Sequence, residues 1–324
     1  MSDDNGHGDC TSFLTLRNVA LFVPEERVPV HQLAEAAQWP ATEARLLTRF
    51  LGLDRVAVAD RHTMTAMLLD AAGAALDGCD GSKVRYLIHA HTMPHIAPPS
   101  MPVLAVLPEK LGLTDARVFA VSHQGCVAGL YALKLCDLLL RAEPAGTMAL
   151  LVVGDKAPSP AARPLRGTSM LGDAAIGVLT ALGGPGDAVI GFAHRTMGRF
   201  YRARYMPMAV RREYLDAYTT TLADVITAAV RKAGLDIGGI AQILPHNVNR
   251  HSWTLIAKAL EIPISRIYLD NVPNLGHCYS ADPFINLEFA RTAGVVTAGD
   301  AVVLASAGEG GTFTAAVLRL TSDQ

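Results

Sequence analysis

The feature that most constrains the fold of this chain is an approximate internal repeat. In the first half, a predicted strand leads to Gly125-Cys126, and a helix and the apolar run 149–155 follow. In the second half, the predicted strand 267–270 leads to Gly276-His277, and a helix and the apolar run 301–306 follow. A repeat of this kind indicates two similar units packed together. Because each unit delivers a reactive side chain to the start of a helix, we expect one site shared between them.

Predicted strands alternate with predicted helices along the chain. Short runs rich in strand-forming residues, typical of buried strands, occupy residues 84–90, 117–121, 148–153 and 301–306. Helical spacing of apolar residues occupies 127–141, 215–233 and 284–293. This alternation favours an α/β fold with sheets buried between helices. The turn cluster Gly183-Gly-Pro-Gly-Asp predicts a boundary between an N-terminal half, 1–185, and a C-terminal half, 186–324.

The composition excludes several classes of protein. Hydrophobic residues make up 50% of the 324 residues and charged residues 18%, which rules out a disordered, collagenous or coiled-coil chain. The formal net charge of −2 provides no basic field that would attract nucleic acid. Unbroken apolar runs such as 148–154 are far shorter than the roughly 18–20 residues of a membrane-spanning helix. The first residues are polar and acidic, unlike a signal peptide, so we expect a soluble cytoplasmic protein.

The cysteines predict a nucleophile rather than a disulfide framework or a metal site. The chain has 5 cysteines, scattered and without a Cys-x-x-Cys pair. A predicted helix begins at Cys126, and the positive end of a helix dipole favours a thiolate there. The alternative is the common role of a free cysteine, a small buried apolar side chain. That role is the interpretation for Cys10, Cys79, Cys136 and Cys278.

Two histidines stand at junctions between predicted elements. His246 follows a strand in the run Leu244-Pro-His-Asn-Val-Asn-Arg, and open α/β sheets bind ligands at the carboxyl ends of their strands. A hydrogen-bonded structural histidine is the alternative at this position. His277 stands where a loop meets a helix. In the run Ser280-Ala-Asp-Pro, Asp282 is interpreted as a helix cap with proline early in the helix.

These residues belong to motifs that resemble those of the thiolase-like condensing enzymes, specifically the ketoacyl-ACP synthase III group. Cys126, with Tyr131-Ala-Leu after it, is similar to the nucleophile segment of that group. The run Leu171-Gly-Asp-Ala-Ala-Ile-Gly is similar to its glycine-aspartate strand. His246 and Asn249 match its His-x-x-Asn motif.

Two further segments extend the resemblance over nearly the whole chain. The run Ala307-Gly-Glu-Gly-Gly-Thr resembles the C-terminal glycine-rich loop of the group, and Arg49-Phe-Leu-Gly is similar to its N-terminal arginine-glycine segment. The resemblance implies a five-layered αβαβα fold made of two duplicated halves, usually a homodimer, with Cys126 as nucleophile. It implies no permanently bound cofactor, because a thioester of coenzyme A or of a carrier protein's phosphopantetheine arrives as substrate.

Two departures from the family pattern bear on the reaction. His277 stands where the family carries asparagine, which resembles the Cys-His-His set of the elongating condensing enzymes. Glu309 stands where the family's loop usually has glycine or an aromatic residue. A carboxylate that orients His277 would complete a Cys-His-acid relay, as attack by an alcohol or amine requires and decarboxylative condensation does not. We therefore predict that Glu309 orients His277, the alternative being a solvated loop residue.

Cationic and polar side chains are predicted to bind the donor. Residues 194–212 contain six arginines, and arginine pairs well with phosphate and with acidic surfaces. This run could dock the phosphates of coenzyme A or an acidic carrier protein, and a solvated charged face is the alternative. The residues predicted to bind the donor are Arg49, Asn249, Arg250 and Arg204.

The sequence as a whole predicts an acyltransferase of natural-product biosynthesis. Cys126 accepts the acyl group from acyl-CoA or an acyl carrier protein, and a hydroxyl or amine of a small molecule receives it. His246 and His277 share the roles of base and oxyanion partner, and backbone N–H groups, that of Cys126 among them, hold the oxyanion. The first alternative is carbon–carbon condensation with a malonyl thioester, which two histidines could support. The second is a catalytically inactive partner subunit that retains the fold.

Overall fold

A computed structural model of the chain describes residues 12–93 and 103–322. Its backbone forms a nine-stranded sheet in the order β11-β12-β13-β10-β1-β9-β6-β4-β5. The strands are β1 (Leu14–Phe22), β4 (Val84–Ala90), β5 (Arg117–Val121), β6 (Met148–Asp155), β9 (Ala174–Leu182), β10 (Asp187–Thr196), β11 (Gln242–Pro245), β12 (Ala301–Gly308) and β13 (Thr312–Arg319). Strand β1 joins the two halves because it pairs antiparallel with both β9 and β10.

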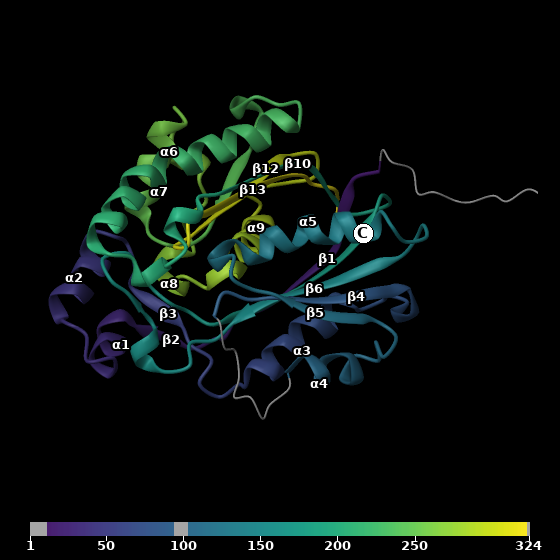
Figure 1. Ribbon diagram of the computed structural model, residues 1–324, viewed down its shortest axis with the longest axis horizontal. Coiled ribbons are helices and arrows are strands. Elements are labelled where there is room, and N and C mark those ends of the chain that lie inside the picture. The colour runs from purple at the N-terminus through teal and green to yellow at the C-terminus, as the bar shows by residue number, and fades with distance from the viewer. Residues whose placement is uncertain (1–11, 94–102, 323–324) are drawn as a thin grey trace, which may run out of the picture.

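Helices lie in three layers around this sheet. Figure 1 shows α3 (Met64–Ala75) and α4 (Val103–Lys110) on one side, and α6 (Met208–Lys232) with α7 (Arg250–Ala259) on the other. Between the two parts of the sheet lie α5 (Ala128–Leu140) and α9 (Asp282–Thr292). The packing agrees, since α3 contacts β9 and β1, α5 contacts β6, α9 contacts β11 and β12, and α6 contacts β10 and β13. The predicted five-layered αβαβα fold is confirmed.

The two halves of the sheet repeat the same order of strands. In the first half, β4 lies parallel to β5 and β6, and β6 pairs antiparallel with β9. In the second half, β11 lies parallel to β12, and β12 pairs antiparallel with β13. The predicted strand 267–270 is reduced to a single parallel bridge between Ile267 and Ile243. The glycine-rich turn between β9 and β10 lies where the chain passes between the halves, and the boundary at 185/186 remains a prediction.

Buried apolar side chains fill the space between the layers. On α5 and α9, which face both parts of the sheet, Leu130, Leu133, Phe284 and Leu287 are at most 1% exposed. Burying a side chain of this size stabilises the fold by roughly 1.5–3 kcal/mol. The start of α6 differs from the prediction, because the helix begins at Met208, directly after Pro207.

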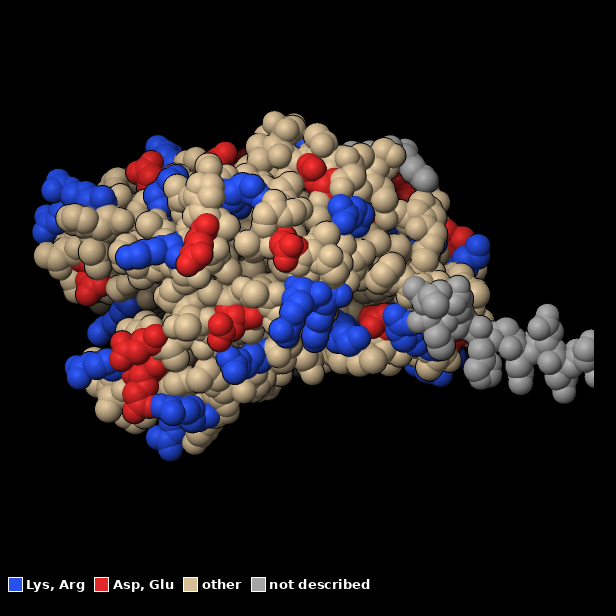
Figure 2. Space-filling model, turned by 90° about the horizontal axis from the view of Figure 1, so that it is seen from above, with Lys and Arg blue, Asp and Glu red and all other residues tan. Residues whose placement is uncertain are grey.

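Smaller elements cover the end of the sheet at which the parallel strands terminate. They are α1 (Val30–Ala36), α2 (Ala41–Arg49), α8 (Val272–Leu275), and two short antiparallel pairs, β2 (Arg27–Pro29) with β3 (Arg55–Ala57) and β7 (Pro164–Leu165) with β8 (Ser169–Met170). Within residues 12–93 and 103–322, no helix has the length and apolar character needed to cross a bilayer. On the face shown in Figure 2, side chains of both charges are interspersed.

Candidate active site

Cys126 lies in the turn that connects β5 to α5. A single 3-10 turn, Gly125–Val127, precedes the helix, so the thiol lies at the N-terminus of α5, as predicted. Gly125 has φ +59°, and a Cβ added there would lie 3.2 Å from the Cα of Gly308. Glycine is required here because backbone from the two halves meets at this point. The Ser306 hydroxyl donates a hydrogen bond of 2.7 Å to the carbonyl oxygen of Cys126 and fixes the turn from the second half.

His277 reaches Cys126 from the second half. It follows α8 and Gly276, whose φ is +67° and where an added Cβ would lie 2.7 Å from the carbonyl oxygen of Met170. The backbone N–H of His277 donates to that same carbonyl at 2.9 Å, and the N–H of Gly172 donates to the carbonyl of His277 at 3.0 Å. The glycine-aspartate strand segment therefore holds the His277 backbone. The imidazole Nε2 lies 3.1 Å from the Sγ of Cys126.

Asp282 binds the other ring nitrogen of His277. Its Oδ2 lies 2.5 Å from the Nδ1 of His277 and accepts a hydrogen bond of 2.6 Å from the backbone N–H of Asn247. Its Oδ1 accepts one of 2.8 Å from the backbone N–H of Cys278. Asp282 is the first residue of α9 and is followed by Pro283, but its buried carboxylate does not cap that helix. The interpretation of Asp282 as a helix cap is therefore wrong, and the residue orients the imidazole.

The three side chains form one hydrogen-bonded chain. A carboxylate can only accept hydrogen bonds, so Nδ1 of His277 carries a hydrogen and Nε2 is the nitrogen that exchanges a proton with Cys126. Burial alone would lower the pKa of His277, but the negative charges of Cys126 and Asp282 and its hydrogen bonds to both raise that pKa well above its ordinary value. The arrangement favours a thiolate paired with an imidazolium.

His246 lies beside this chain in a different environment. It follows β11 directly, as predicted, and the centroid of its ring is 5.8 Å from that of His277. Its Nε2 lies 2.9 Å from the hydroxyl of Tyr218 on α6, and its Nδ1 has no hydrogen-bond partner among the described residues. Burial and, to a smaller extent, the charge of His277 lower the pKa of His246 to about 3. This ring is therefore neutral at physiological pH.

Glu309 does not reach His277. It lies in the turn between β12 and β13, where its Oε1 is 3.7 Å from an Nη1 of Arg211. Both side chains of this pair are partly exposed, at 30% and 25%. Cys126 and Asp282 already occupy both ring nitrogens of His277. The prediction that Glu309 orients His277 is therefore wrong, because the shorter Asp282 comes from the adjacent helix start and fills that place.

The structure describes the side chains of three of the four residues predicted to bind the donor, Arg49, Asn249 and Arg250. Arg49 is exposed at the end of α2, and Arg250 begins α7 with its backbone N–H donating to the carbonyl of Leu51 at 3.0 Å. These two arginines thus come from neighbouring segments. Asn249 caps α7, since its Oδ1 accepts from the N–H of Ser252 at 2.7 Å and its amide donates to a carbonyl, that of Thr168, at 3.0 Å.

Both polar atoms of the Asn249 side chain are therefore engaged within the protein, where Asn249 caps α7, and its role in donor binding stays a prediction. The side chain of Arg204 lies outside the described part of the chain. Elsewhere in the arginine run, Arg199 forms an ion pair with Glu213, and Arg195 lies 3.5 Å from Asp224. Part of the run is thus neutralised by neighbouring carboxylates.

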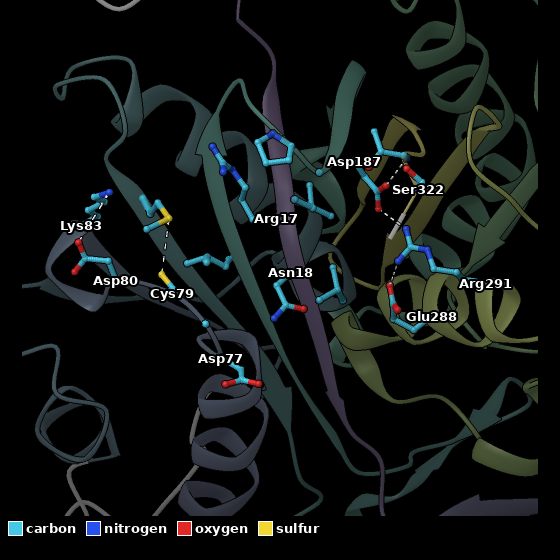
Figure 3. A pocket seen from close by; sticks show the side chains of 18 residues that line it. Arg17, Asn18, Asp77, Cys79, Asp80, Lys83, Asp187, Glu288, Arg291 and Ser322 are labelled. Atoms are coloured by element: carbon cyan, nitrogen blue, oxygen red, sulfur yellow. Dashed lines mark hydrogen bonds and ion pairs between the residues drawn. The ribbon is translucent and has the colours of Figure 1, made fainter. Parts of the chain in front are cut away.

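A cleft in the described part of the chain lies away from these residues. It has a volume of about 690 Å³ and is lined by the first part of β1, the segment after α3 and the last part of α9. Figure 3 shows mixed charge along its walls, with Arg291 facing Asp187 and Glu288 on one side and Lys83 facing Asp80 on the other. Neither Cys126 nor either candidate histidine lines it.

Two residues of the site escaped the sequence interpretation. Asp282 lies five positions after His277, and the intervening 3-10 turn, in which Tyr279 has φ +56°, brings the two side chains together. Periodicity does not predict such a turn. Tyr218 lies four residues after Tyr214, a spacing that places both rings on one helix face, so this pair carried a signal that could have been found.

Comparisons with known proteins find similarity to one group of enzymes. Residues 230–320 match the family described as 3-oxoacyl-[acyl-carrier-protein] synthase III C terminal. A beta-ketoacyl-[acyl-carrier-protein] synthase III from Sphingopyxis alaskensis is 29% identical over 328 residues, covering 94% of this chain and 98% of that protein. The enzyme of the same description from Clostridium perfringens is 26% identical over 328 residues, covering 93% of this chain and 97% of that protein.

Solved structures share the fold at lower identity. The acyltransferase ChlB3 superimposes with a TM-score of 0.84 at 22% identity, covering 96% of this chain and 98% of that one. The 3-oxoacyl-(acyl carrier protein) synthase III of Pseudomonas aeruginosa superimposes with a TM-score of 0.78 at 22% identity, covering 96% and 99%.

Proposed function

Because the chain is a synthase III-like member of the thiolase-like condensing enzymes, and thus an acyl-transferring enzyme, we propose that it carries an acyl group on Cys126 and passes it to a hydroxyl or amine of a small-molecule acceptor. One observation carries this proposal. Asp282, His277 and Cys126 form a continuous chain, with 2.5 Å between Oδ2 and Nδ1 and 3.1 Å between Nε2 and Sγ. A carboxylate that orients a basic imidazole is what an oxygen or nitrogen nucleophile needs.

In the first step, the Cys126 thiolate attacks the carbonyl carbon of the donor thioester. The C–S bond to Cys126 forms, and negative charge moves to the carbonyl oxygen, where the backbone N–H of Cys126 can bind it. Collapse of this intermediate breaks the bond to the donor sulfur. The imidazolium of His277 gives its proton to the departing thiolate, which leaves neutral His277 beside the acyl-enzyme.

In the second step, the acceptor takes the place of the departed thiol. Acylation has removed the negative charge on Cys126, which contributed to the raised pKa of His277, so the neutral imidazole persists until an acceptor arrives. Its Nε2 takes the proton of the hydroxyl or amine as that group attacks the acyl carbonyl. The new C–O or C–N bond forms, the C–S bond breaks, and the thiolate and imidazolium are restored.

The donor is a thioester of coenzyme A or of a carrier protein. Arg49 and Arg250 support this part of the proposal because they are exposed and lie on neighbouring segments, where they could bind phosphate. We also propose a homodimer, because β5 is an edge strand, with only β4 paired to it in the described chain. An exposed strand edge invites pairing with another chain.

Decarboxylative condensation with a malonyl thioester is the competing function. The proximity of the two histidine rings, 5.8 Å apart, favours it. Condensation needs hydrogen-bond donors toward the enolate. Neutral His277, with its hydrogen held on Nδ1 by Asp282, offers a lone pair at Nε2 instead. The tautomer therefore favours transfer to oxygen or nitrogen.

Intact-protein mass spectrometry tests the proposal. The protein is incubated with acetyl-, butyryl-, octanoyl- and malonyl-CoA, with Cys126→Ala as the control. We expect a Cys126-dependent adduct. The adduct is then freed of excess thioester and offered either a panel of small alcohols and amines or malonyl-CoA.

Discharge by an alcohol or amine, with the ester or amide as product, supports the proposal. Discharge by malonyl-CoA alone, with release of carbon dioxide, would establish condensation instead. An adduct that also forms on Cys126→Ala, or no adduct from any of the thioesters, contradicts the role of Cys126 with CoA donors. The same test with acyl groups on a carrier protein then separates a carrier-only donor from an inactive subunit.

A further inference from the structure

The hydrogen bond between Tyr218 and His246 has a direction that the surroundings determine. His246 is 2% exposed and makes one side-chain hydrogen bond within the described residues, 2.9 Å from its Nε2 to the Tyr218 hydroxyl. If Nδ1 carried the hydrogen, a buried N–H would be left without a partner. Orphaned buried N–H groups are rarer than under-satisfied acceptors. We therefore assign the hydrogen to Nε2, which donates it to the oxygen of Tyr218.

This assignment leaves the phenolic hydrogen of Tyr218 available. The hydroxyl accepts from His246 and can still donate its own hydrogen, and the described residues provide no other partner for it. The ring is held by Tyr214, Phe313 and His246, whose centroids lie 5.9, 6.1 and 6.4 Å away. Burial and the charge of Cys126 raise the pKa of Tyr218, so the phenol stays protonated and is a donor.

Exposure places this donor where a substrate can meet it. Cys126 and Tyr218 are both partly exposed, whereas His246, which contacts Tyr218, is buried. The one side-chain hydrogen bond of His246 within the described residues therefore couples it to a side chain that is itself partly exposed. A phenol polarised by a buried imidazole donor is a stronger donor than an isolated one, because hydrogen bonds in a chain reinforce each other.

We propose that the Tyr218 hydroxyl donates a hydrogen bond to the oxyanion on the acyl carbonyl carbon, beside the backbone N–H of Cys126, and that His246 positions and polarises it. Tyr218 is then a catalytic residue, and His246 a positioning residue that takes no proton during the reaction. The inference rests on the proposed function, because it needs the acyl-enzyme on Cys126, but it holds for transfer to oxygen or nitrogen and for condensation alike.

The test compares two reactions of the same thiol. Acylation by the CoA thioester that loads the wild type fastest passes through an oxyanion, whereas alkylation by iodoacetamide displaces iodide without one. We expect Tyr218→Phe to slow single-turnover acylation by about 10²-fold, the range for loss of one oxyanion donor. Its alkylation rate should stay within about twofold of the wild type, because the His277–Asp282 pair is intact. The matched control is Tyr86→Phe, which removes a phenol bonded to Glu143 at the far end of β4 and should change neither rate.

A second variant tests the role of His246. In the background of His246→Phe, which keeps a ring but removes the donor, adding Tyr218→Phe should cost far less than 10²-fold, because coupled residues are not additive. An unchanged acylation rate in Tyr218→Phe, or equal slowing of acylation and alkylation, overturns the oxyanion role. Full additivity of the two substitutions overturns the role of His246. If the wild type itself takes no acyl group, the proposed function fails, and this inference fails with it.

Discussion

The two histidines of the site lie 5.8 Å apart, yet their surroundings shift their pKa values in opposite directions. His277 has a carboxylate on one nitrogen and a thiol on the other, and its pKa is raised well above the ordinary value despite burial. His246 has only a phenol, and burial lowers its pKa to about 3. Groups whose environments separate their pKa values in this way take different roles.

This difference divides the roles that the sequence left shared between the two rings. The raised pKa of His277 makes it a strong proton acceptor beside Cys126, so it is the base of the proposed mechanism. His246 stays neutral throughout the physiological range and can only donate or accept a hydrogen bond. The carboxylate of Asp282 makes this distinction, and its removal should erase it.

The largest effect is expected from Asp282→Asn. An amide at this place no longer fixes the Nδ1–H tautomer of His277, so transfer from acyl-Cys126 to an alcohol or amine should slow by about 10³-fold or more. Single-turnover discharge of the purified acyl-enzyme measures this effect. The melting temperature must be followed in parallel, because Asp282 also accepts backbone hydrogen bonds from Asn247 and Cys278. If folded Asp282→Asn protein transfers the acyl group at the wild-type rate, His277 is not the base of the reaction.

The same substitution, Asp282→Asn, should have a smaller effect on the pH dependence of Cys126 alkylation. In the wild type, the raised pKa of His277 keeps the imidazolium beside the thiolate, so iodoacetamide should still react at pH 6. Burial lowers the pKa of His277, and Asp282→Asn removes one of the two negative charges that oppose this effect. The pKa of His277 should therefore fall in this variant. Each unit of that fall should reduce the rate near pH 6–7 by about tenfold. A parallel pH profile for the two proteins contradicts the ion pair.

Stability should depend on pH through His246 with the opposite sign to His277. The pKa of His246 is about 3 in the folded protein and ordinary in the unfolded chain, so only the unfolded chain takes up its proton below pH 6.5. The free energy of unfolding should therefore fall by about 1.4 kcal/mol per pH unit from this group as the pH drops from 6.5 toward 3. The contribution of His277, whose pKa is raised, is present below pH 6.5 and is lost as the pH rises through its folded value.

Urea unfolding at pH 7, 6 and 5 measures this slope. In His246→Phe, the slope of the free energy of unfolding against pH should be smaller than in the wild type by the contribution of one proton, about 1.4 kcal/mol per pH unit. His89, whose pKa burial also lowers to about 3, is unchanged in this variant and contributes equally to both proteins. Equal slopes would mean that His246 is protonated in the folded state, which would also alter its bond to Tyr218.

The smallest effect is expected from Glu309→Gln. The ion pair with Arg211 is partly exposed, and exposed pairs contribute at most about 1 kcal/mol. The rate of acyl transfer should change by less than about threefold, and the pH profile of alkylation should match that of the wild type. A loss comparable to that of Asp282→Asn would restore Glu309 as the residue that orients the imidazole.

The sequence predicted the scaffold more accurately than the contacts within the site. Predicted strands 84–90 and 117–121 coincide with β4 and β5, because runs rich in apolar and β-branched residues favour strands locally. Strand β4 is largely buried as predicted, whereas most of the edge strand β5 is partly exposed. Cys126 and His277 were predicted because each begins a helical segment, which a sequence pattern can indicate. The family resemblance then supplied the arrangement of layers that the comparisons confirm.

The sequence analysis assigned the carboxylate that orients His277 to the wrong acidic residue. Glu309 stands in a glycine-rich loop known by resemblance to approach the site, whereas Asp282 precedes a helical proline and resembles a cap. Only the turn at Tyr279, with its left-handed backbone, decides which of them meets His277. Tyr218 was missed because it lies on α6, in another layer of the fold, and no sequence pattern predicts its contact with His246.

The short stretch 277–282 contains both the base and the carboxylate that orients it. Backbone groups of Met170, Gly172 and Asn247 hold it from outside the stretch. The nucleophile, by contrast, lies far away in the sequence at the start of α5. A segment of this length could be transplanted into a relative of the same fold as a cassette, carrying the capacity for proton transfer with it while the recipient keeps its own nucleophile.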